Sequence, residues 1–203
     1  MMIKEELIAK IIDLEWIMFQ NVSNAGGRAS CQDDRDTFRI MRSSQAASWS
    51  QEVLESYWVD LLEAQERKRN LLEEKYARMM KYTYPAEYAA IEDKLTPLDS
   101  AEIKLIEDIV EIVMNWESEL LIKYPNIVKK GRPLHSTEDT MYATSVETYL
   151  RGELSTYSQR TLKLYYQHVI KQKSENLNGS EIVLDNMMKK YGFSSLAEAN
   201  NKM

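Results

Sequence analysis

The chain has 203 residues, of which 44% are hydrophobic and 29% are charged, as is typical of a folded globular protein. Its formal net charge of −6 argues against a non-specific nucleic-acid binder, which needs a basic face. A single cysteine excludes an intramolecular disulfide and a metal site made of several cysteines. No apolar stretch approaches the roughly 20 residues that span a bilayer, so we expect no membrane partner and a cytoplasmic location.

The first half of the chain is predicted to be a series of helices. Apolar residues recur at the three-and-four spacing of a buried helical face over residues 3–21. A polar break and a short helix are expected to follow. Capping-box patterns, in which two polar side chains satisfy free amides of a first helical turn, open the next two helices. The first of these helices is predicted over 48–68, with Ser48 and Gln51 as its capping box. The second is predicted to run from Asn70, which forms a box with Glu73, to the Tyr84-Pro85 step, and a short helix is predicted over 87–95.

The second half repeats this order of elements. Asp99 with Glu102 is expected to cap a long apolar helix, and Ser136 or Thr137 a helix with Glu138 and Asp139 in its first turn. Three patterns then recur 108 positions after their first appearance. They are the caps Thr156/Gln159 and Asn178/Glu181, which match Ser48/Gln51 and Asn70/Glu73, and the triplet Met187-Met188-Lys189, which matches Met79-Met80-Lys81.

These matches predict an all-α helical bundle built from two related halves, an internal duplication with an approximate two-fold axis. The first helical repeat is expected over residues 1–96 and the second over 97–203, together forming one compact domain. Two copies favour a closed bundle over a solenoid, which usually needs three or more.

Two polar stretches interrupt the helices, and we expect them to meet at or near the interface between the halves. The first, residues 26–35, contains two glycines, the only cysteine, adjacent carboxylates and arginines. The second, residues 131–139, carries Gly131, Arg132 and His135. If both loops reach one place, they define a polar site.

Cys31 is a candidate catalytic nucleophile. Arg28 or Arg42 would lower the pKa of its thiol, and Asp33 or Glu147 would carry a proton. His135 occupies the matching place in the second stretch, so a Cys/His pair contributed by opposite halves is one hypothesis. The other is that Cys31 is a small buried residue without reactivity.

Arginine side chains suggest a second kind of chemistry. A guanidinium is a planar fork of donors suited to carboxylate or phosphate, so we expect a site for a small anionic or zwitterionic ligand. Its predicted ligand-binding residues are Arg28, Arg42, Gln45, Arg132 and Arg151. The alternative is that arginines and carboxylates pair with each other in a structural or interaction module, which could be a homo-oligomer.

No metal site and no cofactor are predicted. The glycines lack the lysine and Ser/Thr that complete a phosphate-binding loop. The Glu-x-x-His spacing of a di-iron bundle is also absent from the sequence.

Four segments resemble one known family. They are Gly26–Asp34, Ile40–Gln45, Lys75–Met80 and Glu147–Leu154. Together they are similar to a bacterial family described only as a domain of unknown function (number four-one-two-five), and the resemblance extends over nearly the whole chain. It implies a bacterial, cytosolic protein and supplies no activity or catalytic residues.

Overall fold

The computed structural model describes residues 2–23 and 27–203, so Gly26 of the first polar stretch lies outside the described residues. Within these ranges the chain forms helices and no strand, as the sequence predicts. The α-helices are α1 (Lys4–Gln20), α2 (Arg35–Ser48), α3 (Gln51–Glu66), α4 (Leu71–Thr83), α5 (Pro85–Ala89), α6 (Ser100–Lys123), α7 (Pro125–Val128), α8 (Val146–Leu154), α9 (Gln159–Ser174), α10 (Gly179–Lys190) and α11 (Leu196–Lys202). Short 3-10 helices are η1 (Ser30–Asp33), η2 (Glu92–Lys94) and η3 (Ser136–Glu138).

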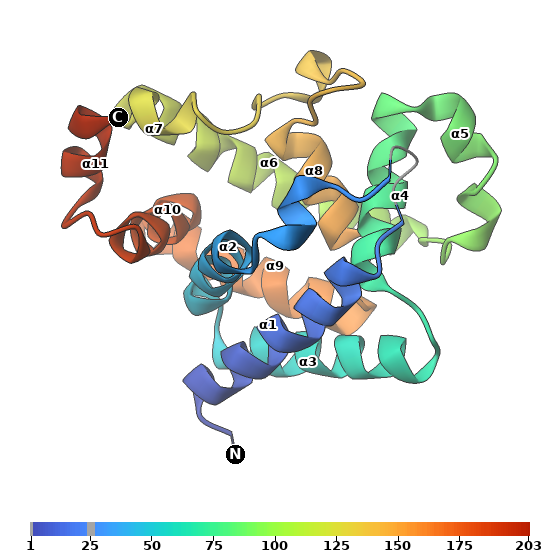
Figure 1. Ribbon diagram of the computed structural model, residues 1–203. Coiled ribbons are helices and arrows are strands. Elements are labelled where there is room, and N and C mark those ends of the chain that lie inside the picture. The colour runs from blue at the N-terminus through green and yellow to red at the C-terminus, as the bar shows by residue number, and fades with distance from the viewer. Residues whose placement is uncertain (1, 24–26) are drawn as a thin grey trace.

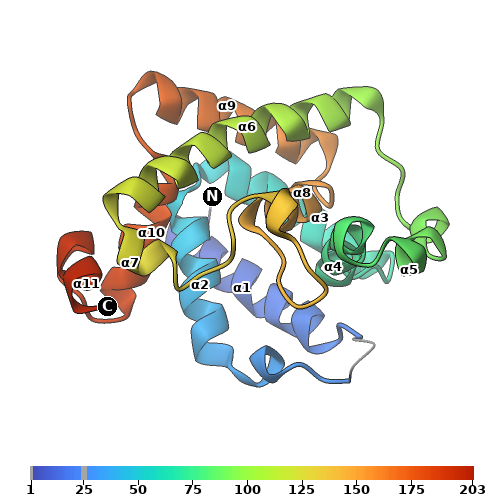
Figure 2. The ribbon, with the colours of Figure 1, turned by 90° about the horizontal axis from the view of Figure 1, so that it is seen from above.

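The two halves of the sequence interlock in space. Helices α3 and α9 lie against each other, with α1 packed on α3 and α6 on α9 (Figure 1). Helix α2 of the first half of the sequence packs on α10 of the second half, and α8 of the second half packs on α4 of the first. Viewed from above, α2 and α10 occupy one side of the molecule, and α4 and α8 lie toward the other (Figure 2).

One continuous apolar core joins elements from both halves. Its fully buried side chains include Leu7, Leu54, Ile109, Leu154 and Leu162, from α1, α3, α6, α8 and α9. A smaller cluster holds α7, α10 and α11 together through Ile127, Met188 and Leu196. No helix in the described ranges combines the length and apolarity needed to cross a membrane.

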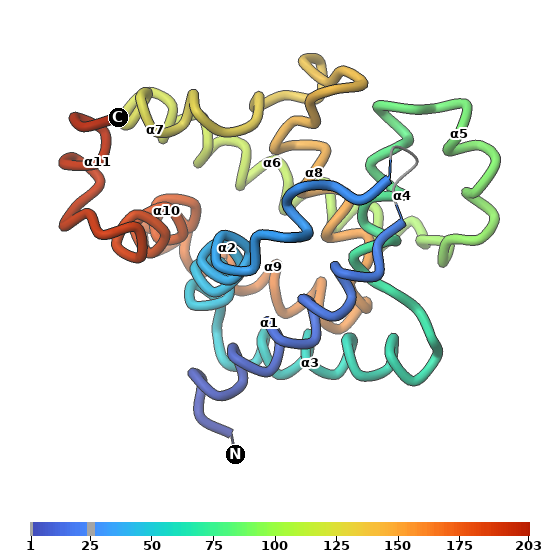
Figure 3. Tube along the Cα trace, in the orientation of Figure 1, coloured from blue at the N-terminus to red at the C-terminus, as the bar shows by residue number. Residues whose placement is uncertain are grey.

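The connection from α7 to α8 crosses the top of the fold (Figure 3). The predicted helix beginning near Ser136 is wrong, because only the 3-10 turn η3 forms there. Helix α8 begins later, at Val146, with Ser145 as its cap. Asp139 accepts hydrogen bonds from the backbone N–H of Ser145 (2.6 Å) and from the hydroxyl of Thr148, so this carboxylate braces the start of α8 from outside the helix.

Helices α3 and α9 begin two residues later than predicted. Ser50 accepts a hydrogen bond from the N–H of Val53, and Ser158 accepts one from Thr161. The predicted caps fail for a shared reason: each hydroxyl already donates to the end of the preceding helix. Ser48 donates to the Gln45 carbonyl and Thr156 to the Glu153 carbonyl, both at 2.7 Å.

Two other predicted caps are confirmed, and their geometry recurs. The Asn70 side chain caps α4 and donates to the Met18 carbonyl at 2.7 Å. The Asn178 side chain caps α10 and donates to the Trp116 carbonyl at 3.1 Å. Asn70 therefore joins the start of α4 to α1, and Asn178 joins the start of α10 to α6.

Elsewhere the predicted boundaries change. The helix expected over 87–95 is split into α5 and η2, which project from the side of the molecule (Figure 1). The short helices α7 and α11 are not predicted, since each has too few residues to show a period. The predicted Asp99/Glu102 capping box is confirmed at the start of α6.

Gly152 allows α8 to approach α4 closely. A Cβ atom at this position would lie 2.8 Å from Met79 Cγ and 3.0 Å from the Lys75 carbonyl oxygen. The missing side chain is therefore required by the packing, and it places the neighbouring Glu153 close to α4.

The corrected caps predict a difference between two nearby serines. Ser50→Ala should lower the free energy of unfolding by about 1 kcal/mol, because an amide in the first turn of α3 loses its acceptor. Ser48→Ala is the matched control and should change it by less than about 0.5 kcal/mol. Urea unfolding measures both. Equal effects, or a larger effect at Ser48, would contradict the assignment of Ser50 as the cap.

Candidate functional site

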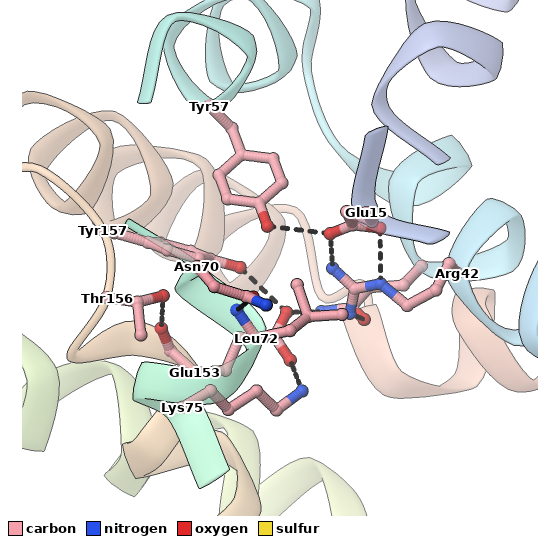
Figure 4. Close-up of polar contacts among 10 residues, drawn as sticks. Glu15, Arg42, Tyr57, Asn70, Leu72, Lys75, Glu153, Thr156 and Tyr157 are labelled. Atoms are coloured by element: carbon pink, nitrogen blue, oxygen red, sulfur yellow. Dashed lines mark hydrogen bonds and ion pairs between the residues drawn. The ribbon is translucent and has the colours of Figure 1, made fainter. Parts of the chain in front are cut away.

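A buried cluster of ionised side chains joins the two halves. Arg42 on α2 donates from Nε to Glu15 Oε2 of α1 (2.9 Å) and also pairs with Glu15 through Nη2. Its Nη1 donates to Glu153 Oε1 of α8 at 2.9 Å. On the other side, Lys75 of α4 donates to Glu153 Oε2 at 2.6 Å. Four helices therefore meet at two carboxylates and two cations, whose formal charges cancel (Figure 4).

Neutral side chains complete this cluster. The Tyr57 hydroxyl donates to Glu15 at 2.7 Å, and the Tyr157 hydroxyl donates to Glu153 at 2.9 Å. Gln45 accepts from Arg42 and donates to Glu153. The Tyr57 and Tyr157 rings also contact each other, with centroids 5.0 Å apart, where α3 meets the start of α9. Figure 4 shows Tyr57 and Tyr157 pointing toward the carboxylates of Glu15 and Glu153.

Burial and pairing set the protonation of the cluster. Burial alone would raise the Glu153 pKa, but the adjacent Arg42 and Lys75 cations outweigh it and hold that pKa well below the ordinary value. Burial also opposes the charge on Arg42, but the Glu15 and Glu153 carboxylates raise the Arg42 pKa well above its ordinary value. Burial lowers the pKa of Lys75, against the effect of Glu153. Arg42 and Glu153 therefore stay ionised across the ordinary pH range.

This cluster forms part of the wall of a cavity of about 530 Å³. The size lies within the range of small-molecule sites. Helices from both halves enclose it, and most of its lining is apolar or aromatic. The ionised or polar side chains along it include Asp34, Arg42, Gln45, Lys75, Glu117, Arg132, Glu153 and His168.

The two polar stretches both reach this cavity. Cys31, from the first, lines it and is exposed, as is Arg132 from the second. The cavity is therefore accessible from solvent near these residues. Arg132 lies over the Tyr149 ring, with its Cζ atom 4.6 Å from the centroid, and Lys75 Nζ lies 3.5 Å from the same centroid.

Among the described residues, two tyrosine hydroxyls of the cavity have no hydrogen-bond partner. Tyr76 and Tyr149 line the cavity, and neither hydroxyl makes a hydrogen bond to another residue within the ranges that the structure describes. Burial raises the pKa of each to about 12, so both hydroxyls keep their protons as donors. Lys75 donates one hydrogen bond there, to Glu153. The Tyr76 and Tyr149 hydroxyls, which are hydrogen-bond donors, and the cations of Lys75 and Arg132 thus line the same cavity.

Other predicted site residues belong to separate contacts. On the surface, Arg28 donates to Asp33 at 2.8 Å, and neither side chain lines the cavity. Arg151 binds Glu107 through two hydrogen bonds and pairs with Glu147 at 2.9 Å. The five arginine and glutamine residues proposed as ligand-binding thus fall into three places, and only Arg42, Gln45 and Arg132 line the cavity.

Glu147 and His135 lie together, away from the cavity lining. Burial alone would raise the Glu147 pKa, but the Ser136 N–H, at 2.7 Å, and Arg151 together lower it. His135 Nδ1 lies 3.9 Å from the Glu147 carboxylate. His135 is not among the residues that line the cavity with Cys31, so this arrangement does not support a shared Cys31/His135 site.

Sequence reasoning missed Glu15, Lys75, Tyr76 and Tyr149 as members of the site. Glu15 could have been predicted from one feature of the sequence. It is a carboxylate inside an apolar stretch of α1, where a buried charge needs a partner. Lys75 gave none, because a lysine on a helix is ordinarily solvated. Within the described residues, no three His, Cys, Asp or Glu side chains gather as metal ligands.

The fold and cavity define an all-helical protein with an interior cavity. Part of the cavity wall is a buried cluster of ionised side chains whose formal charges cancel. The chain matches the family model described as "Protein of unknown function (DUF4125)" over residues 5–201, and it belongs to this family. Comparisons with curated proteins and with solved structures find no match. The four segments that carry the resemblance supply the cavity residues Cys31, Arg42, Gln45, Lys75 and Glu153.

Breaking the cluster should destabilise the protein strongly. Arg42→Met leaves two buried carboxylates short of a cation, which typically costs about 3–5 kcal/mol. Arg28→Met removes a pair whose side chains are 47% and 67% exposed, and should cost less than about 1 kcal/mol. Urea unfolding of both variants tests this. Similar small losses would mean that the cluster contributes little to stability.

The lowered Glu153 pKa also predicts a pH dependence. An unfolded glutamate titrates near about 4.3, so the stabilisation is complete above that pH and is lost as pH falls toward the lower pKa of the folded state. The difference in urea midpoint between wild type and Glu153→Gln should therefore shrink below about pH 4. A difference that stays constant on acidification would contradict the ionised state of Glu153.

Proposed function

We propose that the protein binds a small anionic molecule in the cavity between α2, α4, α6, α8 and α10. The anionic group would lie near Tyr149, where Lys75 and Arg132 supply positive charge and the tyrosine hydroxyls supply donors. The observation that carries this proposal is the pair of cations on one aromatic ring, beside tyrosine hydroxyls that bind no other residue in the described part of the chain. The apolar remainder of the cavity would hold the body of the ligand.

Arg42 and Gln45 would act by positioning other groups. Both bind Glu153, which in turn holds Lys75 at 2.6 Å. Within the cluster, Arg42 and Lys75 balance Glu15 and Glu153, so the charge of Arg132 beside Tyr149 is not neutralised by the cluster, which favours an anion at this position.

Cys31 is the residue through which the site could act as an enzyme. Its thiol is exposed at the cavity, so it could attack a bound electrophile. Asp33 and Glu147 remain proposed proton carriers. Each already pairs with an arginine in the structure, which supports ligand binding over catalysis as the leading function.

We also propose that residues 1–96 and 97–203 are related copies in a cytoplasmic protein of a bacterial family. The support is positional: Lys68 and Asn176, 108 positions apart, share a φ of 56°, and the caps at Asn70 and Asn178 make matching contacts. In this arrangement the cavity lies where the copies interlock.

A structural or assembly module is the second candidate. It is favoured by one observation, that Arg28, Arg42 and Arg151 all pair with carboxylates of the same chain. It predicts that Arg42→Met changes the oligomeric state in light scattering. It also predicts that no small anion binds to the wild type.

The test uses octanoate, octyl phosphate and the neutral octanamide as probes. We expect the anions to bind, measured by calorimetry, and to slow alkylation of Cys31, the only cysteine. Arg132→Gln should weaken binding of an anion by about tenfold, corresponding to roughly 1.4 kcal/mol. Arg151→Gln removes an arginine outside the cavity and is the matched control. Equal binding of octanamide, or an unchanged affinity in Arg132→Gln, would refute the proposed anion site.

A further inference from the structure

Glu117 is a carboxylate in the cavity wall that the charge cluster does not use. It lies on α6, lines the cavity, and faces Ser180 at the start of α10. No cation pairs with it among the residues that the structure describes, and burial raises its pKa. The Ser180 side chain is its hydrogen-bond partner, but an ionised carboxylate away from water is costly without a compensating charge, so this position calls for an explanation.

An aromatic residue, Phe19, follows the matching cap contact in the first half of the chain. Asn70 binds the carbonyl of Met18, and the next residue, Phe19, is buried and stacks on Phe38 with centroids 5.1 Å apart. Asn178 binds the carbonyl of Trp116, and the next residue is Glu117. The same local geometry thus positions an aromatic ring in one half and a carboxylate in the other.

Glu117 and Lys75 belong to different sides of the cavity. Lys75 is on α4 and contacts α8, whereas Glu117 contacts α10. In both views α4 and α10 lie on opposite sides of the molecule (Figures 1 and 2). The lining of the cavity also includes the apolar side chains Val113, Leu120, Leu150 and Leu184. The cavity wall therefore carries Lys75 from α4 and, from α6 beside α10, Glu117, with apolar side chains elsewhere in the lining.

We propose that the ligand is bipolar, with an anionic group at Lys75 and Arg132, an apolar spacer, and a protonated amine bound by Glu117. This inference rests on the proposed function, since it uses the same anion site. An ammonium group supplies the cation that Glu117 lacks, and Ser180 adds a hydroxyl beside it. Neutral ligands of the same shape would leave the carboxylate unpaired.

The experiment compares ω-amino carboxylates, from 4-aminobutanoate to 8-aminooctanoate, with carboxylates of the same chain length. Calorimetry is done on the full chain as wild type, Glu117→Gln and Glu111→Gln. Glu111 is an exposed residue of the same helix outside the cavity lining and is the matched control. For at least one chain length, we expect the amino compound to bind wild type and Glu111→Gln about tenfold more tightly than the plain carboxylate. In Glu117→Gln this advantage should disappear, with the affinity for the plain carboxylate unchanged.

The outcomes separate the two proposals. If plain carboxylates bind but the amine adds no affinity at any length, or if its advantage survives in Glu117→Gln, the bipolar ligand is refuted and the anion site stands. If neither series binds, both proposals fail. A thermal melt of Glu117→Gln verifies folding, and the substitution should leave stability nearly unchanged, because an amide can keep the hydrogen bond with Ser180 and no ion pair of the described residues is lost.

Discussion

The ion pairs of Arg42 with Glu15 and Glu153 are the constraint on which the arrangement of helices depends. A buried guanidinium is tolerated only when its donors are satisfied, so α1, α2 and α8 must meet at fixed positions. Lys75 brings α4 to the same point through Glu153. The pairs fix geometry more than they add free energy, because desolvation offsets much of the attraction between buried charges. These contacts fix the positions of three helices, α2, α4 and α8, whose residues line the cavity.

Local patterns predicted much of the fold. Apolar periodicity and the asparagine caps specified the helical class and the starts of α4 and α10, since both depend on residues within a turn of each other. The caps of α3 and α9 were misplaced because the choice between two hydroxyls depends on which one the preceding helix has already engaged. The hydroxyls of Ser48 and Thr156 each close the helix before them. That competition cannot be read from spacing alone.

The site was harder to predict, for a physical reason. Arg42, Gln45, Arg132 and Cys31 were selected for their chemistry, and they do line one cavity. Lys75 was missed because its partner Glu153 lies 78 positions away in the chain. A helical period cannot distinguish a buried lysine with a distant partner from a solvated one. Arg28 and Arg151 share the chemistry of Arg42, but they pair with carboxylates that do not line the cavity. Three-dimensional pairing therefore decides which arginines reach the interior.

Gly152 links the steric and electrostatic requirements of the protein. The space that a methyl group would need there is already taken by the backbone of Lys75 and the side chain of Met79. The adjacent residue, Glu153, must reach the ammonium of that same Lys75. A larger side chain would act as a wedge between α8 and α4, lengthening a hydrogen bond to which it does not itself belong. The small volume of Gly152 thus allows Lys75 and Glu153, which are 78 positions apart in the chain, to form their ion pair.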